Sequence, residues 1–396
     1  MPTPLAGTLM SAANHHPPDA LARCEYHQEG PVTLYLGDAQ HVLAAMPDAS
    51  VDCVVTSPPF WGLRDYGAGN WDGGDPSCAH EVRRRLDGTR CPRCTAVWSD
   101  PQYGLEPTLD EYVDRLVAVF THVRRVLAPA GTCWLNLGDS YSSASGGAPR
   151  AGRPQPGGRR PPRPRAQDTL APKNLLGVPW RVAFALQTDG WWLRNAIIWS
   201  KTNPMPESVR DRLSTTYELI FLLTPSPTYH FDLDPIRIPL THPAAADGTR
   251  VIGGARKGTT GGIAATARRR GATAYGSKYT ATDTTEPRAS AGNLKPLGHA
   301  HTTAHRRGRN PGDVWRIATR PYRGSHIAPF PIDLPLRAIA AGCPADGVVL
   351  DPFSGAATTG LAAMQLGRRY LGIDIAARFH DEAITRLRPH LPQARP

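Results

Sequence analysis

The chain has 396 residues, 40% of them hydrophobic, which is enough to bury a sizeable core and excludes a wholly disordered protein. No stretch approaches the roughly 18 uninterrupted apolar residues of a membrane-spanning helix, and no basic start precedes an apolar run, so we expect a cytoplasmic protein with no membrane partner. Lys and Arg exceed Asp and Glu by 11, which suits a nucleic-acid partner, with a merely basic soluble enzyme as the alternative.

Two apolar runs near the N-terminus predict buried strands that end in polar loops. The first is Val32 to Leu36, followed by Gly37-Asp38, and the second is Val51 to Val55, followed by a polar turn that contains two prolines. Loops of this kind, directly after buried strands, are suited to holding ligands.

A strand, helix, strand order continues along the chain. From Leu109 to Leu127 apolar residues recur at helical spacing, which predicts an amphipathic helix ended by Pro129-Ala130-Gly131. Thr132 to Leu137 then predicts a strand that runs into Gly138-Asp139. This order is typical of an open α/β sheet.

Two segments divide the rest of the chain. About 144–168 is rich in Gly, Pro, Arg and Ser and predicts a flexible basic loop, and 241–309 is similarly poor in large apolar residues. Between and after them we expect these elements: a helix near Pro179 to Leu186, a strand Leu193 to Ser200, an apolar run Leu219 to Leu223, a helix Pro335 to Ala341, a strand Val348 to Leu350, a helix Thr358 to Leu366, a strand Tyr370 to Ile373 and a helix from Ala376. The strand, helix and strand from Val348 to Ile373 form a βαβ unit.

The turn inside that βαβ unit predicts a cofactor site. Asp351 to Gly360 is rich in small residues, which let a cofactor approach the backbone, and Asp374 ends the next strand, where a carboxylate accepts hydrogen bonds from ribose. The turn lacks the G-x-G-x-x-G spacing of dinucleotide enzymes, so a nucleoside cofactor without pyrophosphate fits better. Alone, the turn is equally a tight turn of any α/β protein.

This segment resembles the S-adenosylmethionine signature Asp-Pro-Phe-x-Gly-Ser-Gly-Thr-Thr of amino-directed DNA methyltransferases. The resemblance implies that S-adenosylmethionine contacts Asp351, Phe353, Gly355, Thr358 and Asp374. The chain departs from the signature at Ala356 and Ala357, and alanine keeps such a turn only if its φ is negative.

Two further segments resemble cofactor segments of the same family. His326 to Pro331 is similar to the segment that covers the methionine end, which implies roles for His326, Phe330 and Pro331. Gly37-Asp38 is similar to a position near the adenine, although a loop aspartate is as often a helix cap.

Ser57-Pro58-Pro59-Phe60 predicts the catalytic centre. The prolines fix the backbone, so the Ser57 hydroxyl and the Pro58 carbonyl are suitable acceptors for the hydrogens of an exocyclic amine, and Phe60 is placed to stack on a base turned out of the duplex. The tetrapeptide is similar to the family's catalytic motif, in which Ser is commonest in cytosine-N4 enzymes and Asp in many adenine-N6 enzymes. A cytosine-C5 enzyme would need a nucleophilic cysteine in a Pro-Cys pair, which the chain lacks, and Cys53 lies inside an apolar strand.

The catalytic motif precedes the cofactor turn, an order that resembles the β group of permuted DNA methyltransferases. This implies a circularly permuted, Rossmann-like α/β methyltransferase sheet, with further matching segments at Asn174 to Asp189, Trp191 to Ser208 and Tyr217 to Thr224. We expect a tail at 1–30, the catalytic half at 31–233, a target-recognition region at 234–312 and the cofactor half at 313–396.

A small insertion at about 76–100 predicts a structural zinc site. Cys78, His80, Cys91 and Cys94 offer four ligands on two short arms, one with C-x-x-C spacing, while the alternative is reduced thiols beside a surface histidine. The neighbouring arginines 83–85, 90 and 93, like the basic clusters 268–270 and 305–309, are candidates for phosphate contacts or simply solvated charge.

The favoured hypothesis is therefore an S-adenosylmethionine-dependent cytosine-N4 methyltransferase that acts on double-stranded DNA. An adenine-N6 enzyme on the same fold is the first alternative, and a DNA-binding protein with impaired catalysis, motivated by Ala356 and Ala357, is the second. A homodimer and a cognate restriction nuclease are further partners to expect.

Overall fold

The computed structural model describes residues 19–80, 88–142, 170–240, 305, 307–322, 324 and 329–391. The chain divides into two compact units: unit 1 comprises Met1–Asp232 and Asp313–Pro396, and unit 2 comprises Leu233–Gly312. Every strand named below belongs to unit 1.

One large mixed sheet forms the centre of unit 1. Its five neighbouring strands β2, β11, β10, β3 and β6 are all parallel, β8 is antiparallel to both β6 and β7, and β1 is antiparallel to β2 at the opposite edge. The order across the sheet is β1 (Glu25–Glu29), β2 (Val32–Leu36), β11 (Arg369–Asp374), β10 (Val348–Asp351), β3 (Val51–Thr56), β6 (Leu127–Leu137), β8 (Tyr217–Thr224), β7 (Trp192–Lys201) and β9 (Val314–Ile317). This confirms the predicted α/β class.

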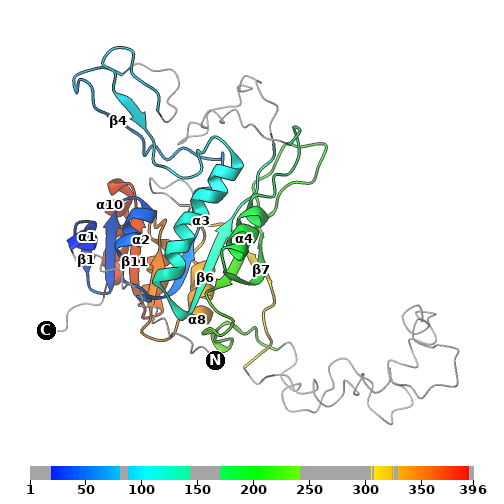
Figure 1. Ribbon diagram of the computed structural model, residues 1–396. Helices are drawn as coiled ribbons and strands as arrows, with labels where there is room; N and C mark the ends of the chain where they lie inside the picture. Colours follow the sequence, from blue (N-terminus) through cyan, green and yellow to red (C-terminus); the bar gives the residue numbers. More distant parts are fainter. Residues whose placement is uncertain are drawn as a thin grey trace, which may run out of the picture. The chain divides into compact units, whose positions relative to one another are not determined.

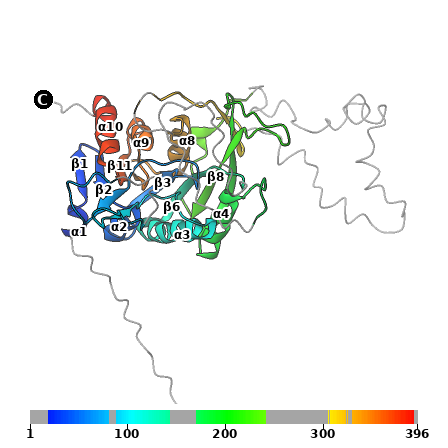
Figure 2. The same cartoon turned by 90° about the horizontal axis from the view of Figure 1, so that it is seen from above.

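Helices cover both faces of the sheet (Figure 2). One face carries α2 (Ala39–Ala45), α3 (Leu109–Val126) and α4 (Val178–Thr188), and the other carries α8 (Asp333–Gly342), α9 (Thr358–Gln365) and α10 (Ala377–Leu387). The short α1 (Asp19–Ala22) and the 3-10 turn η3 (Arg388–His390) complete the helices of unit 1 among the described residues. The parallel strands are therefore buried on both sides, as their continuous apolar sequences require.

Helix α3 shows how the sequence specifies these boundaries. The Thr108 side chain caps it by accepting a hydrogen bond from the Glu111 amide at 3.2 Å, and its last residue is Val126. Strand β6 then begins at once with Leu127, five residues before the predicted start at Thr132, so that Pro129 lies inside the strand rather than ending the helix. The helix buries the predicted face, including Tyr112, Leu116, Phe120 and Val123.

A second, small sheet lies on the excursion between β3 and α3. Strands β4 (Asn70–Asp72) and β5 (Val97–Ser99) pair antiparallel, and Figure 1 shows β4 projecting beyond the end of the main sheet. No helix within the described ranges is long and apolar enough to cross a membrane.

The described part of unit 2 is short. It contains the 3-10 turn η1 (Asp234–Ile236) and a bridge between Ile238 and Arg309, and both carboxylate oxygens of Asp234 are paired, one with Arg237 and one with Arg307, each at 2.7 Å. The predicted basic cluster 268–270 lies outside the described residues.

Candidate active site

A cavity of about 840 Å³ opens at the carboxyl ends of the parallel strands. Because these ends meet at one edge of the sheet, the loops that follow β2, β3, β6, β10 and β11 all contribute to its wall. The cavity brings together most of the site residues predicted from the sequence, namely Asp38, Ser57, Pro58, Pro59, Phe60, Phe330, Asp351, Phe353, Thr358 and Asp374.

Two predicted cofactor residues are placed differently, and a third is not described. Gly355 and Pro331 are not part of the cavity wall, although their neighbours Ser354, Ala356 and Phe330 are. His326 lies outside the described residues.

A chain of hydrogen bonds fixes the Ser57 hydroxyl. Ser57 Oγ donates to Asn136 Oδ1 at 3.0 Å, and Asn136 Nδ2 donates to Glu218 Oε2 and to the Leu219 carbonyl, each at 3.1 Å. Both partners on the nitrogen side are acceptors, so the orientation of the Asn136 amide is determined and its oxygen must face Ser57.

The hydrogen-bond network that begins at Ser57 ends in a partly buried ion pair. Lys201 Nζ lies 2.6 Å from Glu218 Oε1, and the exposed fractions of these two side chains are only 22% and 16%. The ammonium also lies 5.0 Å from the centre of the Trp199 ring. Glu218 is therefore held between Lys201 and Asn136, and all four polar residues from Ser57 to Lys201 line the cavity.

The two prolines of the motif have different surroundings. The Pro59 carbonyl accepts a hydrogen bond from the Tyr112 hydroxyl at 3.0 Å, whereas the carbonyl of the buried Pro58 receives none from any described residue. Within the described part of the chain, the Pro58 carbonyl beside Ser57 is therefore an acceptor without a partner, and its role in binding an amine stays a prediction.

Phe60 occupies space left by a glycine. A Cβ atom added to Gly138, at the end of β6, would lie 2.5 Å from the edge of the Phe60 ring. The absence of a side chain at Gly138 is thus what allows Phe60 to stand at this place in the cavity wall.

Asp351 joins the cofactor turn to the strand that carries the catalytic motif. Its carboxylate is 2% exposed and accepts hydrogen bonds at 2.7 Å from the Thr56 and Thr359 hydroxyls and at 3.1 Å from the Phe353 amide. Burial raises its pKa to about 6. The carboxylate is thus engaged inside the protein at the back of the cavity.

Asp374 organises the same turn from the neighbouring strand. One carboxylate oxygen accepts from the Gly355 amide at 2.8 Å and the other from the Ala376 amide at 2.9 Å, and burial raises its pKa. Each oxygen keeps a lone pair for a further donor, so Asp374 remains available to ligand hydroxyls.

The structure contradicts the expected backbone of the cofactor turn. Ala357, which caps α9, has a φ of +52° and lies in the left-handed region, not at the negative φ expected for alanine. Its position in the family signature is the one that carries glycine, which adopts this conformation without strain. The turn therefore forms with the alanine in the left-handed region.

Asp38 is a helix cap, one of the two roles weighed for it, and its role near a cofactor stays a prediction. It is the N-cap of α2 and accepts a hydrogen bond from the His41 amide at 3.1 Å, and it also lines the cavity. Nearby, the buried Tyr103 hydroxyl has no hydrogen-bond partner among the described residues, and burial raises the pKa of this hydroxyl.

These features test whether S-adenosylmethionine fits. The ligand carries a cationic sulfonium and amine, ribose hydroxyls and an aromatic base. The wall offers the carboxylates of Asp38 and Asp374, the unpartnered hydroxyl of Tyr103 and the rings of Phe353 and Phe379. Acidic, polar and aromatic groups of the required kinds are therefore present together.

The four predicted metal ligands also come together. Their ligand atoms all lie within 4.8 Å of one another, with Cys78 Sγ and Cys91 Sγ at 3.9 Å and Cys94 Sγ and His80 Nδ1 at 3.4 Å. Ligands of a tetrahedral zinc ion lie roughly 3.3–3.8 Å apart, given zinc bond lengths of 2.0–2.3 Å. The His80 ring is held by stacking on Trp71, with ring centres 4.7 Å apart. The geometry thus fits such an ion.

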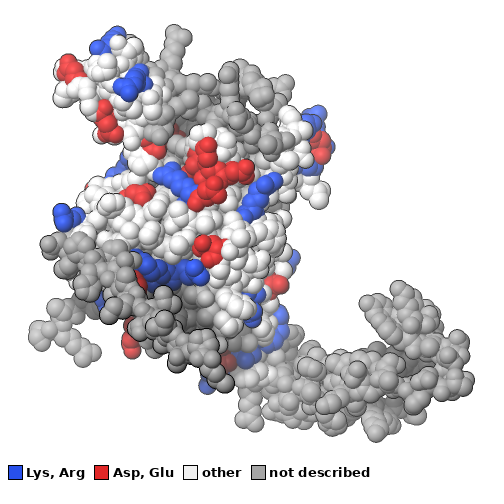
Figure 3. Space-filling model, in the orientation of Figure 1, with Lys and Arg blue, Asp and Glu red and all other residues white. Residues whose placement is uncertain are grey.

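Charge is unevenly distributed along the chain. Figure 3 shows acidic and basic side chains mixed on the face that carries α3, without a continuous basic surface among the described residues. By contrast, Lys and Arg outnumber Asp and Glu by nine to three in residues 241–304 and by six to one in residues 143–169. Much of the positive charge therefore lies in sequence outside the described residues.

Comparison with known proteins decides the family. A family model of N6 and N4 methyltransferases, described as DNA methylase, matches residues 51–385. The chain belongs to this DNA methylase family. The resemblance predicted from the catalytic and cofactor motifs is thus confirmed, as is the prediction of an enzyme.

Relatives of this DNA methylase are similar over nearly their whole length. The type II methyltransferase M.Cfr9I of Citrobacter freundii is 33% identical over 93% of this chain and 92% of its own, and M.SmaI of Serratia marcescens is 34% identical over 89% and 90%. Among solved structures, the PvuII DNA methyltransferase, described as cytosine-N4-specific, has a TM-score of 0.51 at 16% identity and covers 94% of this chain and 90% of that one. That structural similarity supports the fold alone.

Sequence reasoning missed three polar residues of the cavity wall. Asn136 lay inside a run interpreted simply as a strand, and neither Lys201 nor Glu218 was assigned a role. A signal existed, because a polar side chain within an otherwise apolar buried strand needs hydrogen-bond partners.

Proposed function

We propose that this S-adenosylmethionine-dependent DNA methylase transfers the methyl group to the exocyclic N4 amine of cytosine in double-stranded DNA. The observation that carries the proposal is the pair of acceptors at the centre of the cavity. Ser57 gives its hydrogen to Asn136, so its lone pairs face the cavity, and the Pro58 carbonyl beside it is unpartnered among the described residues.

Two fixed acceptors match what an exocyclic amine offers. The amine has two N–H donors, and its lone pair is delocalised into the ring. Hydrogen bonds to Ser57 Oγ and the Pro58 carbonyl hold the hydrogens out of the ring plane and so concentrate the lone pair on nitrogen. Phe60 supports the base by stacking once it has left the duplex.

S-adenosylmethionine supplies a methyl group activated by the positive charge of its sulfonium. Asp38, Tyr103, Phe353 and Asp374 are the residues that we propose to hold it. None of the partners of Ser57 in this network is a free base, because Asn136 is an amide and Glu218 is paired with Lys201. The network therefore orients the amine and is not suited to take up its proton.

Serine at position 57 favours cytosine, since the family motif more often has Asp in adenine-N6 enzymes. Adenine-N6 methylation is the second candidate, because the same acceptors serve either amine. Mass spectrometry of nucleosides from DNA incubated with labelled donor separates the two. N4-methylcytosine that disappears with Ser57→Ala supports the proposal, and N6-methyladenine overturns the assignment of the base.

A member of this enzyme family that binds DNA but has impaired catalysis is the remaining alternative. Its motivation was Ala356 and Ala357, yet the cofactor turn closes with Ala357 at a φ of +52°. Saturable binding of S-adenosylmethionine in a calorimetric titration would exclude this alternative, whereas no labelled base and no binding would favour it.

The order of strands supports the permuted arrangement that we propose for this chain. Strands β10 and β11 are among the last in the sequence but lie between β2 and β3, which are among the first. The type II names of the relatives further support a role in restriction and modification, with a partner nuclease of the same specificity.

We also propose that the basic segments 143–169 and 241–304 supply phosphate contacts to DNA, and that the second of them, within 234–312, contributes target recognition. Their excess of Lys and Arg supports this, because contacts to phosphate release counterions and strengthen binding at low salt. DNA affinity should therefore fall steeply with salt, and a shallow dependence would contradict the proposal.

Finally, we propose that Cys78, His80, Cys91 and Cys94 bind one structural zinc ion. Elemental analysis of purified protein should give one zinc per chain, and Cys94→Ser should lose it. Cys24→Ser is the matched control, since the Cys24 thiol lies outside the cluster and bonds only the Ala20 carbonyl among the described residues. Equal zinc content in both variants would contradict the assignment.

A further inference from the structure

The segment between β3 and α3 leaves the main body of unit 1 and returns to it beside the cavity. We call the two paired stretches at this point, residues 61–66 and 100–106, the neck. The outgoing arm, residues 61–66, and the returning arm, residues 100–106, are joined by four hydrogen bonds. Trp61 Nε1 donates to the Glu106 carbonyl at 3.0 Å, and the Gly62 amide donates to the Gly104 carbonyl at 2.8 Å.

Gln102 supplies the other two links between the arms. Its amide oxygen accepts from the Tyr66 amide at 2.7 Å, and its Nε2 donates to the Arg64 carbonyl at 2.9 Å. Both arms line the cavity, with Leu63, Arg64 and Tyr66 on one and Pro101, Gln102 and Tyr103 on the other. The neck is thus part of the wall.

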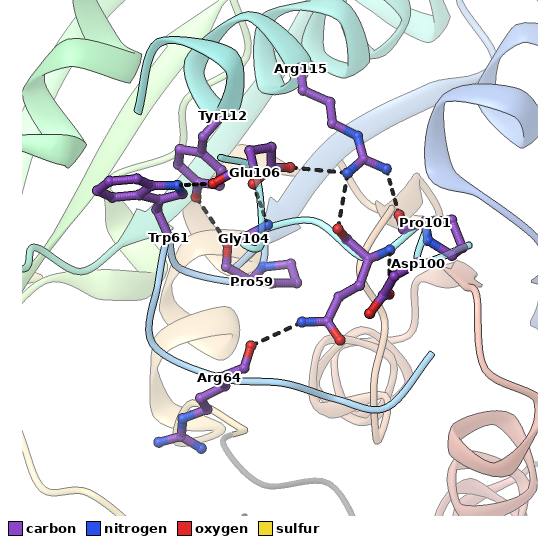
Figure 4. Close-up of polar contacts among 10 residues, drawn as sticks. Pro59, Trp61, Arg64, Asp100, Pro101, Gly104, Glu106, Tyr112 and Arg115 are labelled. Atoms are coloured by element: carbon purple, nitrogen blue, oxygen red, sulfur yellow. Dashed lines mark hydrogen bonds and ion pairs between the residues drawn. The ribbon is translucent and has the colours of Figure 1, made fainter. Parts of the chain in front are cut away.

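Arg115 of helix α3 holds the returning arm (Figure 4). Its guanidinium donates to the Pro101 carbonyl, to the Gln102 carbonyl at 2.9 Å and to Glu106 Oε1 at 3.1 Å. The same guanidinium lies 3.9 Å from the centre of the Tyr103 ring. A planar fork of donors is required for this set of partners, and a lysine ammonium cannot reproduce it.

Glu106 completes the arrangement. Its side chain is 6% exposed, one oxygen faces Arg115 and the other accepts from the Gly104 amide at 2.8 Å. Gly104 lies so close to the catalytic motif that an added Cβ would be 2.9 Å from the Phe60 carbonyl. One turn before Arg115 on the same helix, the Tyr112 hydroxyl bonds the Pro59 carbonyl.

The arm held by Arg115 also reaches the cofactor turn. The Tyr103 ring, 4% exposed, packs edge-on against Phe353 with ring centres 5.2 Å apart. The Arg115 guanidinium is therefore connected to two parts of the site. Through Glu106 and Gly104 it reaches the catalytic motif at Pro59 and Phe60. Through Tyr103 it reaches Phe353 of the cofactor turn.

We infer that Arg115 and Glu106 are positioning residues, which together set the place of the catalytic motif relative to the methyl-donor wall. Neither residue touches the cavity, so their effect passes through Tyr103, Gly104 and the neck. The inference rests on the proposed function, because it takes the Tyr103 and Phe353 wall as the donor site.

Helix α3 itself provides a matched control. Arg125 is a second multidentate arginine on the helix, and it bonds the Leu43 and Met46 carbonyls and Asp48, none of which lines the cavity. Arg125→Lys should therefore remove a comparable set of hydrogen bonds at the C-terminal end of α2, from residues that do not line the cavity.

The test compares Arg115→Lys, Glu106→Gln and Arg125→Lys in the full chain. By hydrogen exchange with mass spectrometry and no ligand, Arg115→Lys and Glu106→Gln should speed exchange in residues 57–66 and 101–106, and Arg125→Lys should not. In a calorimetric titration, the Kd of Arg115→Lys and of Glu106→Gln for S-adenosylmethionine should rise on the order of tenfold. Arg125→Lys should keep the wild-type Kd.

The outcomes separate the two claims. Unchanged exchange in both arms, or equal changes of Kd in all three variants at matched melting temperatures, would overturn the positioning role. Failure of the wild-type protein to bind S-adenosylmethionine would overturn the donor site, while faster exchange in the two arms would still support the link between Arg115 and the catalytic motif.

Discussion

The Ser57 hydroxyl donates its hydrogen to Asn136 Oδ1, 3.0 Å away, and the orientation of Asn136 is itself imposed by Glu218 and the Leu219 carbonyl. A serine hydroxyl rotates freely unless its hydrogen is committed, and a rotating hydroxyl would also present a donor to the amine. The network thus makes Ser57 a dedicated acceptor.

Removal of the partner should therefore impair transfer more than binding. We expect Asn136→Ala to lower the single-turnover rate about 10- to 100-fold, equivalent to about 1–3 kcal/mol, because the Ser57 hydrogen is no longer committed. Glu218→Gln should have a smaller effect in the same direction, since its side chain can still accept from Asn136. Calorimetry should give an unchanged Kd for S-adenosylmethionine in both variants, and a large rise in Kd with a normal rate would contradict this account.

Because Phe60 packs against Gly138, we predict that a smaller side chain at position 60 relieves the clash made by a substitution at Gly138. Gly138→Ala places a methyl group where the Phe60 ring lies and should lower kcat/KM on DNA by roughly tenfold or more, because overpacking of about 1–3 kcal/mol displaces the ring. Phe60→Leu also lowers kcat/KM, by loss of stacking. In the double variant the clash is gone, so activity should be no lower than in Phe60→Leu alone. Additive losses would show that Gly138 acts elsewhere.

Asp351 predicts an unusual dependence of stability on pH. Burial raises its pKa in the folded protein to about 6, above its ordinary value, so the folded state binds a proton that the unfolded state releases. This contribution to stability is present at low pH and is lost as pH rises from about 4 to about 6. Asp351→Asn lacks it, so the stability of the variant relative to wild type should improve over that window by up to roughly 3 kcal/mol and stay constant above it. Denaturant midpoints of both proteins at several pH values measure the difference, and parallel curves would contradict the raised pKa.

The left-handed Ala357 predicts an asymmetric response to substitution. Ala357→Gly removes about 1–2 kcal/mol of backbone strain and about 0.8 kcal/mol of buried methyl, so stability should stay within about 1 kcal/mol of wild type. Ala357→Val should destabilise by about 2 kcal/mol or more, because a β-branched residue at positive φ has no space in this buried turn. Urea midpoints report both effects. A strongly destabilised glycine variant would mean that the alanine methyl matters more than the strain.

The elements predicted correctly are those with strong periodicity. Helix α3 has a continuous apolar stripe, and the strands that became β2, β3, β10 and β11 are short apolar runs bounded by polar turns. Strand β1 was missed because Glu25–Glu29 is a largely polar edge strand, and helix α2 because its seven residues are too short to establish a period. In both cases tertiary pairing, not local sequence, decides the structure.

The site divides in the same way. Contiguous motifs such as Ser57 to Phe60 and Asp351 to Thr358 were found, because adjacent residues share one loop. Asn136, Glu218 and Lys201 come from three strands whose pairing sequence reasoning did not predict. The contacts of the neck could not be predicted from the sequence either. Arg115 donates to the backbone carbonyls of Pro101 and Gln102, and every residue has such a carbonyl, so no residue type marks the acceptors.

The position of β10 and β11 has a consequence for biosynthesis. These strands pair between β2 and β3, so that Val349 lies opposite Cys53, almost three hundred residues earlier in the chain. A ribosome delivers them long after their neighbours, and until then β2 and β3 each present an unpaired edge that invites aggregation. The proposed methyl-donor site therefore forms only after β10 and β11 have been synthesised, and folding of the sheet should be slow and sensitive to chaperone supply. A circularly permuted gene that places residues from Asp313 onward ahead of Asp19 would let β10 and β11 emerge before β2 and β3. A higher yield of folded protein from this gene than from the natural one would show that the natural strand order slows folding.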